Sequence, residues 1–107
     1  MHPFLNIADR AARMAGKTIL DGLKRLDRIR MQEKQDNRGV VTEIDLKAES
    51  IIIDTIREAY PRHGILAEES NPIDGEGYIW IIDPLDGTSN YIHDFPHFAV
   101  SIAIKNK

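Results

Sequence analysis

The fold is decided by one stretch of the sequence, Trp80-Ile81-Ile82-Asp83-Pro84-Leu85-Asp86-Gly87-Thr88-Ser89-Asn90-Tyr91. Its apolar beginning predicts a buried strand over Tyr78–Ile82, with Trp80 as a core anchor. Pro84 and Gly87 predict a tight turn after that strand, which would bring Asp83, Asp86 and an intervening carbonyl towards one point. Oxygen ligands favour magnesium, manganese or calcium over zinc or copper. The stretch therefore predicts a hard-cation site at the end of a strand.

A second pair of acids, Glu68-Glu69, follows the short apolar run Ile65–Ala67. If the two strands end at the same sheet edge, Glu68 lies beside Asp83. Two carboxylates about 4 Å apart repel by roughly 4 kcal/mol at an effective dielectric near 20, so converging acids call for a divalent cation. The amides of Gly87 and Thr88 would offer a seat for a phosphate group. Together these features predict metal-assisted phosphoryl transfer to water.

The same residues also have a plainer interpretation. Asp-Pro-x-Asp-Gly is ordinary turn chemistry, and Glu68-Glu69 is compatible with a solvated strand end. The combination of the two acidic motifs favours the functional interpretation. Phosphatases of the haloacid dehalogenase type are a poor match, because they place one residue between the two acids, whereas Pro84 and Leu85 make two here.

Two helices are predicted from apolar residues at steps of three and four. The first covers Pro3 to about Leu26 and the second begins at the capping-box-like Thr42-Glu43-Ile44-Asp45 and stops at Pro61. The polar composition of Asp27–Gly39 predicts a solvated connection, with a short extended piece at Arg28–Glu33. The stripe of the first helix consists of Leu5, Ala8, Ala12, Ala15, Ile19 and Leu23.

Composition indicates one globular domain of ordinary type. The chain has 107 residues, 42% hydrophobic and 29% charged, a net charge of -3 and no cysteine. Scattered basic residues argue against direct nucleic-acid binding, and no apolar run is long enough for a membrane span, so we expect a cytoplasmic protein. A last strand over Phe98–Ile104 has two faces that both look buried, so we expect an incomplete domain.

These motifs together resemble the inositol monophosphatase family. The residues that carry the resemblance are Lys34, Val41-Thr42-x-x-Asp45, Glu68-Glu69-Ser70 and the motif from Trp80 to Tyr91. The opening His2-Pro3-x-Leu5-Asn6-Ile7-Ala8 and the closing Pro96-His97-Phe98-Ala99-Val100-Ser101-Ile102-Ala103 resemble a bacterial branch of that family. Ala67 departs from the family's usual glycine, and Ser89 from a common threonine.

The resemblance implies the fold and the domain organisation. We expect an α/β fold, more closely an α+β sandwich, in which two long helices pack on a largely antiparallel sheet. Residues 1–107 would be the amino-terminal portion of a single domain whose carboxyl-terminal part is absent.

The resemblance also implies metal ligands. Glu68, Asp83 and the carbonyl of Leu85 would bind a first Mg²⁺, and Asp83 and Asp86 would share a second, with two or three ions in a complete site.

Catalytic and substrate roles follow from the same resemblance. Thr88, hydrogen-bonded to Asp45, would act with Glu68 to position and deprotonate the attacking water. Asp86, Gly87 and Thr88 would contact the substrate, and Lys34 corresponds to the family's mobile-loop lysine.

The implied activity is magnesium-dependent, lithium-sensitive hydrolysis of small phosphate monoesters, with inositol 1-phosphate or a related sugar phosphate as the expected substrate. The 107-residue chain alone is expected to be inactive, and a homodimer is expected. An alternative comes from the bacterial branch, whose members also join the transcription antitermination machinery for ribosomal RNA. In that case the partners would be antitermination factors or RNA polymerase, and phosphatase chemistry would be dispensable.

Overall fold

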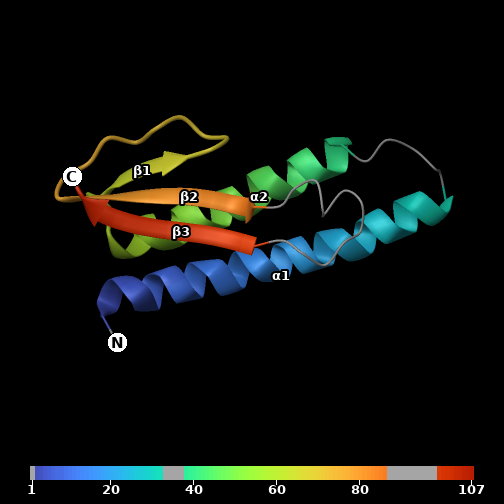
Figure 1. The fold of residues 1–107 in the computed structure, drawn as a ribbon, viewed down its shortest axis with the longest axis horizontal. Helices are drawn as coiled ribbons and strands as arrows, with labels where there is room; N and C mark the ends of the chain where they lie inside the picture. Colours follow the sequence, from blue (N-terminus) through green and yellow to red (C-terminus); the bar gives the residue numbers. More distant parts are fainter. Residues whose placement is uncertain (1, 33–37, 87–98) are drawn as a thin grey trace.

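Two helices lie on one face of a three-stranded sheet, which confirms the predicted α+β class (Figure 1). The computed structural model describes residues 2–32, 38–86 and 99–107. Neither described helix is apolar enough over a sufficient length to cross a membrane. The elements are α1 (Pro3–Gln32), α2 (Arg38–Ala59), β1 (Gly64–Ala67), β2 (Tyr78–Asp86) and β3 (Ala99–Asn106).

The sheet is mixed and has the order β1-β2-β3. β1 pairs with β2 in parallel, with Ala67 opposite Ile82, and β3 pairs with β2 antiparallel. A parallel pair needs a connection that returns the chain to the start of the sheet, and residues 68–77 provide it without a helix. This connection is held to β1 by two backbone hydrogen bonds between Ile65 and Ile73, of 2.8 and 2.9 Å.

Both helices are longer than the sequence pattern predicts. α1 runs to Gln32, so the predicted extended piece is helical over residues 28–32, and α2 begins at Arg38 rather than at the capping-box motif near Thr42. Lysine, arginine and glutamine are good helix formers even where no apolar stripe is present. The stripe fades because the facing ends of the two helices extend beyond the sheet (Figure 1). A polar composition there therefore does not indicate a loop.

The core lies between the two helices and the adjacent face of the sheet. Small residues let α1 and α2 approach closely. Trp80 of β2 is fully buried in this core, as predicted. The predicted stripe of α1 is wrong at Leu5, which is 57% exposed, because the helix turns the neighbouring Phe4 towards the core instead. The buried hydrophobic residues are Ala11, Ala15, Ile19, Ile44, Ala48, Ile52, Ile56, Ile65, Trp80 and Ile82.

The far face of the sheet is open to solvent in the described part of the chain. Along β3, Val100, Ile102 and Ile104 pack against the core, whereas Ser101 and Ala103 are exposed. Both helices lie on the other side of the sheet (Figure 1), so this face is uncovered among the described residues, and the expected partner for it stays a prediction. None of the described elements between residues 2 and 86 packs on this far face of the sheet.

An aromatic cluster closes the end of the sheet where α1 begins. The Phe4 ring meets Tyr60 edge-on at 5.0 Å, and Tyr60 stacks on His63 at 4.8 Å with an interplanar angle of 3°. The indole Nε1 of Trp80 donates a hydrogen bond to Nδ1 of His63 at 3.0 Å. His63 therefore provides the hydrogen-bond acceptor that the fully buried indole N–H of Trp80 needs.

We expect His63→Phe to destabilise the chain. Phenylalanine preserves the ring contact with Tyr60 but leaves the buried indole N–H of Trp80 without an acceptor, which costs about 1–3 kcal/mol. Urea denaturation followed by circular dichroism measures the loss. In a Trp80→Phe background, which lacks the donor, the same substitution should cost clearly less, and equal costs in both backgrounds would contradict the assignment.

Candidate functional site

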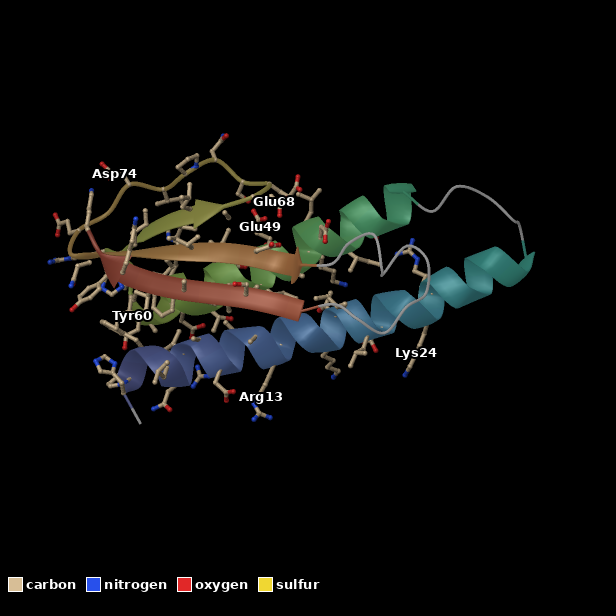
Figure 2. The ribbon with its side chains drawn as sticks, in the orientation of Figure 1. Arg13, Lys24, Glu49, Tyr60, Glu68 and Asp74 are labelled. Carbon is tan, nitrogen blue, oxygen red and sulfur yellow. The ribbon has the colours of Figure 1, made fainter. Side chains whose placement is uncertain are left out.

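The parallel pairing of β1 and β2 brings two acidic positions to one edge of the sheet. Ala67 and Ile82 are register partners, so Glu68 and Asp83 each follow at the same step. The negative charge of Asp83 acts on the Glu68 carboxyl and is the largest cause of its raised pKa. The predicted juxtaposition of Glu68 and Asp83 is thus present in the structure. Glu68 lies close to Glu49 of α2, at the end of the sheet opposite Tyr60 and Asp74 (Figure 2).

The main chain from Asp83 to Asp86 differs from the tight turn that the sequence predicted. β2 does not end at Ile82 but continues through Pro84 to Asp86. Asp83 is opposite Ser101 and Asp86 opposite Ala99, so β2 carries one extra residue between them, as in a β-bulge. Proline has no amide hydrogen and cannot donate a hydrogen bond to a neighbouring strand. A bulge is one of the few positions in a strand that tolerates proline. A bulge in a continuing strand thus stands where the sequence predicted a turn.

Helix α2 contributes two further acids to this edge. Asp45 and Glu49 are separated by one helical turn and so lie on the same side of the helix. Glu49 is fully buried, and its Oε2 accepts the backbone N–H of Glu69 at 3.0 Å. The sequence analysis missed Glu49. The available signal was a charged residue one turn after Asp45, next to the buried Ala48 in the apolar stripe.

Repulsion among these acids shifts their protonation. Burial, followed by the negative charges of Glu69, Glu68, Asp83 and Glu49, raises the pKa of Asp45 from 3.8 to about 6. The pKa of Glu68 is also raised, first by the charge of Asp83, then by partial burial and by its hydrogen bond to Asp83. Among the residues that the structure describes, every charged group that acts on these two carboxyls is itself an acid. The edge is therefore strongly electronegative.

Three carboxylate oxygens here are buried and lack a hydrogen-bond partner: Oδ1 of Asp45, Oε1 of Glu49 and Oδ1 of Asp83. Buried polar atoms are normally satisfied, so orphaned acceptors need an explanation. Hard, oxygen-only acceptors without a cationic side chain beside them suit Mg²⁺ or a similar ion. The residues thus fit a divalent cation chemically, although no three described His, Asp or Glu side chains are placed so as to hold one unaided.

The remaining predicted site residues are not brought into this cluster by the described structure. Leu85 and Asp86 belong to β2, but only their backbone is described. Gly87, Thr88 and Lys34 lie outside the described residues. The ligand and substrate roles predicted for these five residues therefore stay predictions.

A family model, related sequences and solved structures all relate this chain to the same group of proteins. The profile described as the inositol monophosphatase family matches residues 1–107. A protein of Pseudomonas aeruginosa named Nus factor SuhB is 54% identical over 111 residues, covering 100% of this chain and 41% of the relative. The chain thus spans about two fifths of the length of such relatives.

Two solved structures resemble this fold. The extragenic suppressor protein SuhB of Bartonella henselae superposes with a TM-score of 0.79 at 36% identity, covering 96% of this chain and 39% of that one. The inositol monophosphatase of Anabaena superposes with a TM-score of 0.77 at 38% identity, covering 96% and 35%. Both identities are high enough for the similarity to include the sequence as well as the fold.

We expect Asp45→Asn to stabilise the metal-free chain at neutral pH. The folded chain holds the Asp45 proton more tightly than the unfolded chain does, so the contribution of this carboxyl to stability is lost as the pH rises from 3.8 to about 6. The substitution removes that penalty, worth about 1–2 kcal/mol once solvent screening at this partly exposed carboxyl is allowed for. Urea denaturation in the presence of a chelator, repeated between about pH 4 and pH 8, measures the difference.

The gain should be close to zero at the acid end and largest at the alkaline end. Asp54→Asn is the matched control, because Asp54 is exposed on the same helix. The acids Asp45, Glu49, Glu68, Glu69 and Asp83 together form what we call the acidic edge. A gain in stability for Asp45→Asn that does not vary with pH would show that repulsion at the acidic edge is not its cause.

Proposed function

The chain belongs to the inositol monophosphatase family, as its motifs indicate, and we propose that it forms the cation-binding portion of a magnesium-dependent phosphatase. The proposed reaction is hydrolysis of small phosphate monoesters by water, with inositol 1-phosphate as the expected substrate. Residues 1–107 would be the amino-terminal portion of the catalytic domain. A cytoplasmic homodimer is part of the same proposal, and the absence of cysteine suits a reducing compartment.

The observation that carries the proposal is the set of buried, unpartnered carboxylate oxygens on Asp45, Glu49 and Asp83. Gathering these acids beside Glu68 and Glu69 costs folding free energy, because like charges repel and burial removes water. A structural role would be served equally well by neutral side chains. A cation-binding role makes use of the negative charge of Asp83 and Glu68 and explains why these acids are held together.

The proposed roles of the residues follow their positions. Asp83 and Glu68, joined across the parallel strand ends, would bind the cation directly, with the Leu85 carbonyl and Asp86 completing the ligands. Bound Mg²⁺ supplies positive charge for the phosphate oxygens and acidifies the attacking water. Asp45 would orient the hydroxyl of Thr88 by accepting its hydrogen bond.

Substrate binding is assigned to the segment after β2. The amides of Gly87 and Thr88 would receive the phosphate, and Asp86 would contact the sugar hydroxyls. Lys34 would help to recruit a further cation. In this scheme the protein positions groups and neutralises charge, as phosphoryl transfer through a loose transition state requires.

A second candidate function rests on the names of the relatives. Proteins called Nus factor SuhB are 50–54% identical to this chain in several bacteria. We propose as the alternative that the protein joins the transcription antitermination machinery for ribosomal RNA through antitermination factors or RNA polymerase. This role would depend on protein contacts and would not need the acidic edge.

We expect Mg²⁺ to bind the wild-type chain, more tightly in the presence of inorganic phosphate, and to stabilise it. A ligand at 100 times its dissociation constant adds about 2.7 kcal/mol to the free energy of unfolding. Asp83→Asn should lose this gain, yet should be at least as stable as wild type in a chelator, because one repelling charge is gone. Isothermal titration calorimetry and thermal unfolding measure the two effects.

Asp54→Asn again serves as the control and should bind Mg²⁺ like the wild type. The phosphatase proposal would be contradicted if the wild-type chain bound no Mg²⁺. It would also be contradicted if Asp83→Asn bound Mg²⁺ with unchanged affinity and phosphate dependence.

A complementation experiment separates the two candidate functions. Wild type and Asp83→Asn are each expressed in a bacterium that lacks its own SuhB, and growth is compared. If the regulatory role is the principal one, the variant should restore growth as well as wild type does, despite its loss of Mg²⁺ binding. Restoration by the wild type alone would assign the essential role to the acidic edge.

A further inference from the structure

Glu49 is a charged side chain in an apolar setting. It has no exposed surface and lies on α2 next to Ala48 and one turn before Ile53, both of which belong to or pack against the hydrophobic core. An ionisable side chain at such a position is costly unless its polar atoms are used. Its retention therefore needs a specific contact to explain it.

One carboxylate oxygen of Glu49 makes such a contact. Oε2 accepts the backbone N–H of Glu69 at 3.0 Å, which joins the middle of α2 to the chain that leaves β1, 20 residues further along. Hydrogen bonds from a backbone amide to a carboxylate are stronger than those between neutral groups. The contact fixes the main chain at the point where β1 ends.

The anchored amide directly follows Glu68, whose carboxyl group interacts with that of Asp83. β1 has only four residues, Gly64–Ala67, so the sheet itself holds little of the chain beyond Ala67. Glu68 and Glu69 are both exposed, and repulsion from Asp83 tends to push Glu68 away from the edge. A restraint on the Glu69 amide opposes that movement.

We propose that Glu49 is a positioning residue that accepts the N–H of Glu69 and thereby holds Glu68 beside Asp83 for cation binding. This role rests on the proposed function, because it matters only if Glu68 and Asp83 share a cation. Glu49 touches neither substrate nor reacting atoms in this scheme. Its effect passes through the main chain of residues 68 and 69.

Two substitutions separate the hydrogen bond from the charge. Glu49→Gln keeps a side-chain oxygen that accepts the Glu69 amide, whereas Glu49→Leu has similar size and no acceptor. Leucine suits the apolar surroundings, and replacing a buried charge by a well-packed apolar side chain is often neutral or stabilising. A loss of cation affinity in a leucine variant that remains folded therefore reports on positioning.

The experiment titrates Mg²⁺ with inorganic phosphate present into wild type, Glu49→Gln, Glu49→Leu and the control Asp54→Asn by calorimetry. We expect Glu49→Leu to bind Mg²⁺ about 10–100-fold more weakly, the usual effect of removing a group that orients a metal ligand. Glu49→Gln should retain most of the wild-type affinity. Amide hydrogen exchange of Glu69, followed by NMR, should be slow in wild type and Glu49→Gln and fast in Glu49→Leu.

The outcomes distinguish this inference from the function on which it rests. If the wild type binds no Mg²⁺, the proposed function fails and the positioning role fails with it. If the wild type binds Mg²⁺ and Glu49→Leu binds it equally well, only the positioning role is overturned. If Glu49→Gln is as weak as Glu49→Leu while its Glu69 amide stays protected, the charge of Glu49 matters and the hydrogen bond does not.

Discussion

Repulsion among carboxylates at one edge of a small sheet is the constraint on which the rest of the structure depends. The parallel register of β1 and β2 sets Ala67 opposite Ile82, so Glu68 and Asp83 follow at the same step and their like charges are brought together. α2 then adds Asp45 and Glu49 from the helical layer. The apolar core between the helices and the sheet holds these acids in place against their mutual repulsion.

The two ends of the sheet are built in opposite ways. At the end where α1 begins, rings pack together and the indole of Trp80 finds its acceptor in His63, so the polar atoms are satisfied within the chain. At the acidic edge, oxygens of Asp45, Glu49 and Asp83 are left without partners. Proteins commonly tolerate strain where function needs it, and the contrast supports the proposal that this molecule functions at the acidic edge.

A buried acid can be kept either for its charge or for a contact, and the acidic edge contains both cases. Asp45 and Asp83 have buried oxygens that face other acids, which suits a cation. Glu49 uses one oxygen on the amide of Glu69 and so ties the helical layer to the strand end. Family membership adds weight to a phosphatase, and the Nus factor names of several relatives add weight to a regulatory role.

The family and the two-helix, three-strand content could be predicted from the sequence, because short-range periodicity and a specific motif encode them. The approach of Glu68 to Asp83 could be predicted only on the condition that their two strands meet at one edge of the sheet, which the parallel register of β1 and β2 fulfils. The sequence pattern misjudged the ends of the helices, since polar composition does not separate a solvated helix from a loop, and it misjudged the turn at Pro84, where the strand continues through a bulge. Only the tertiary structure decided that Glu49 is buried and bound to Glu69. That contact joins residues 20 apart, and no local pattern reports a partner at that distance.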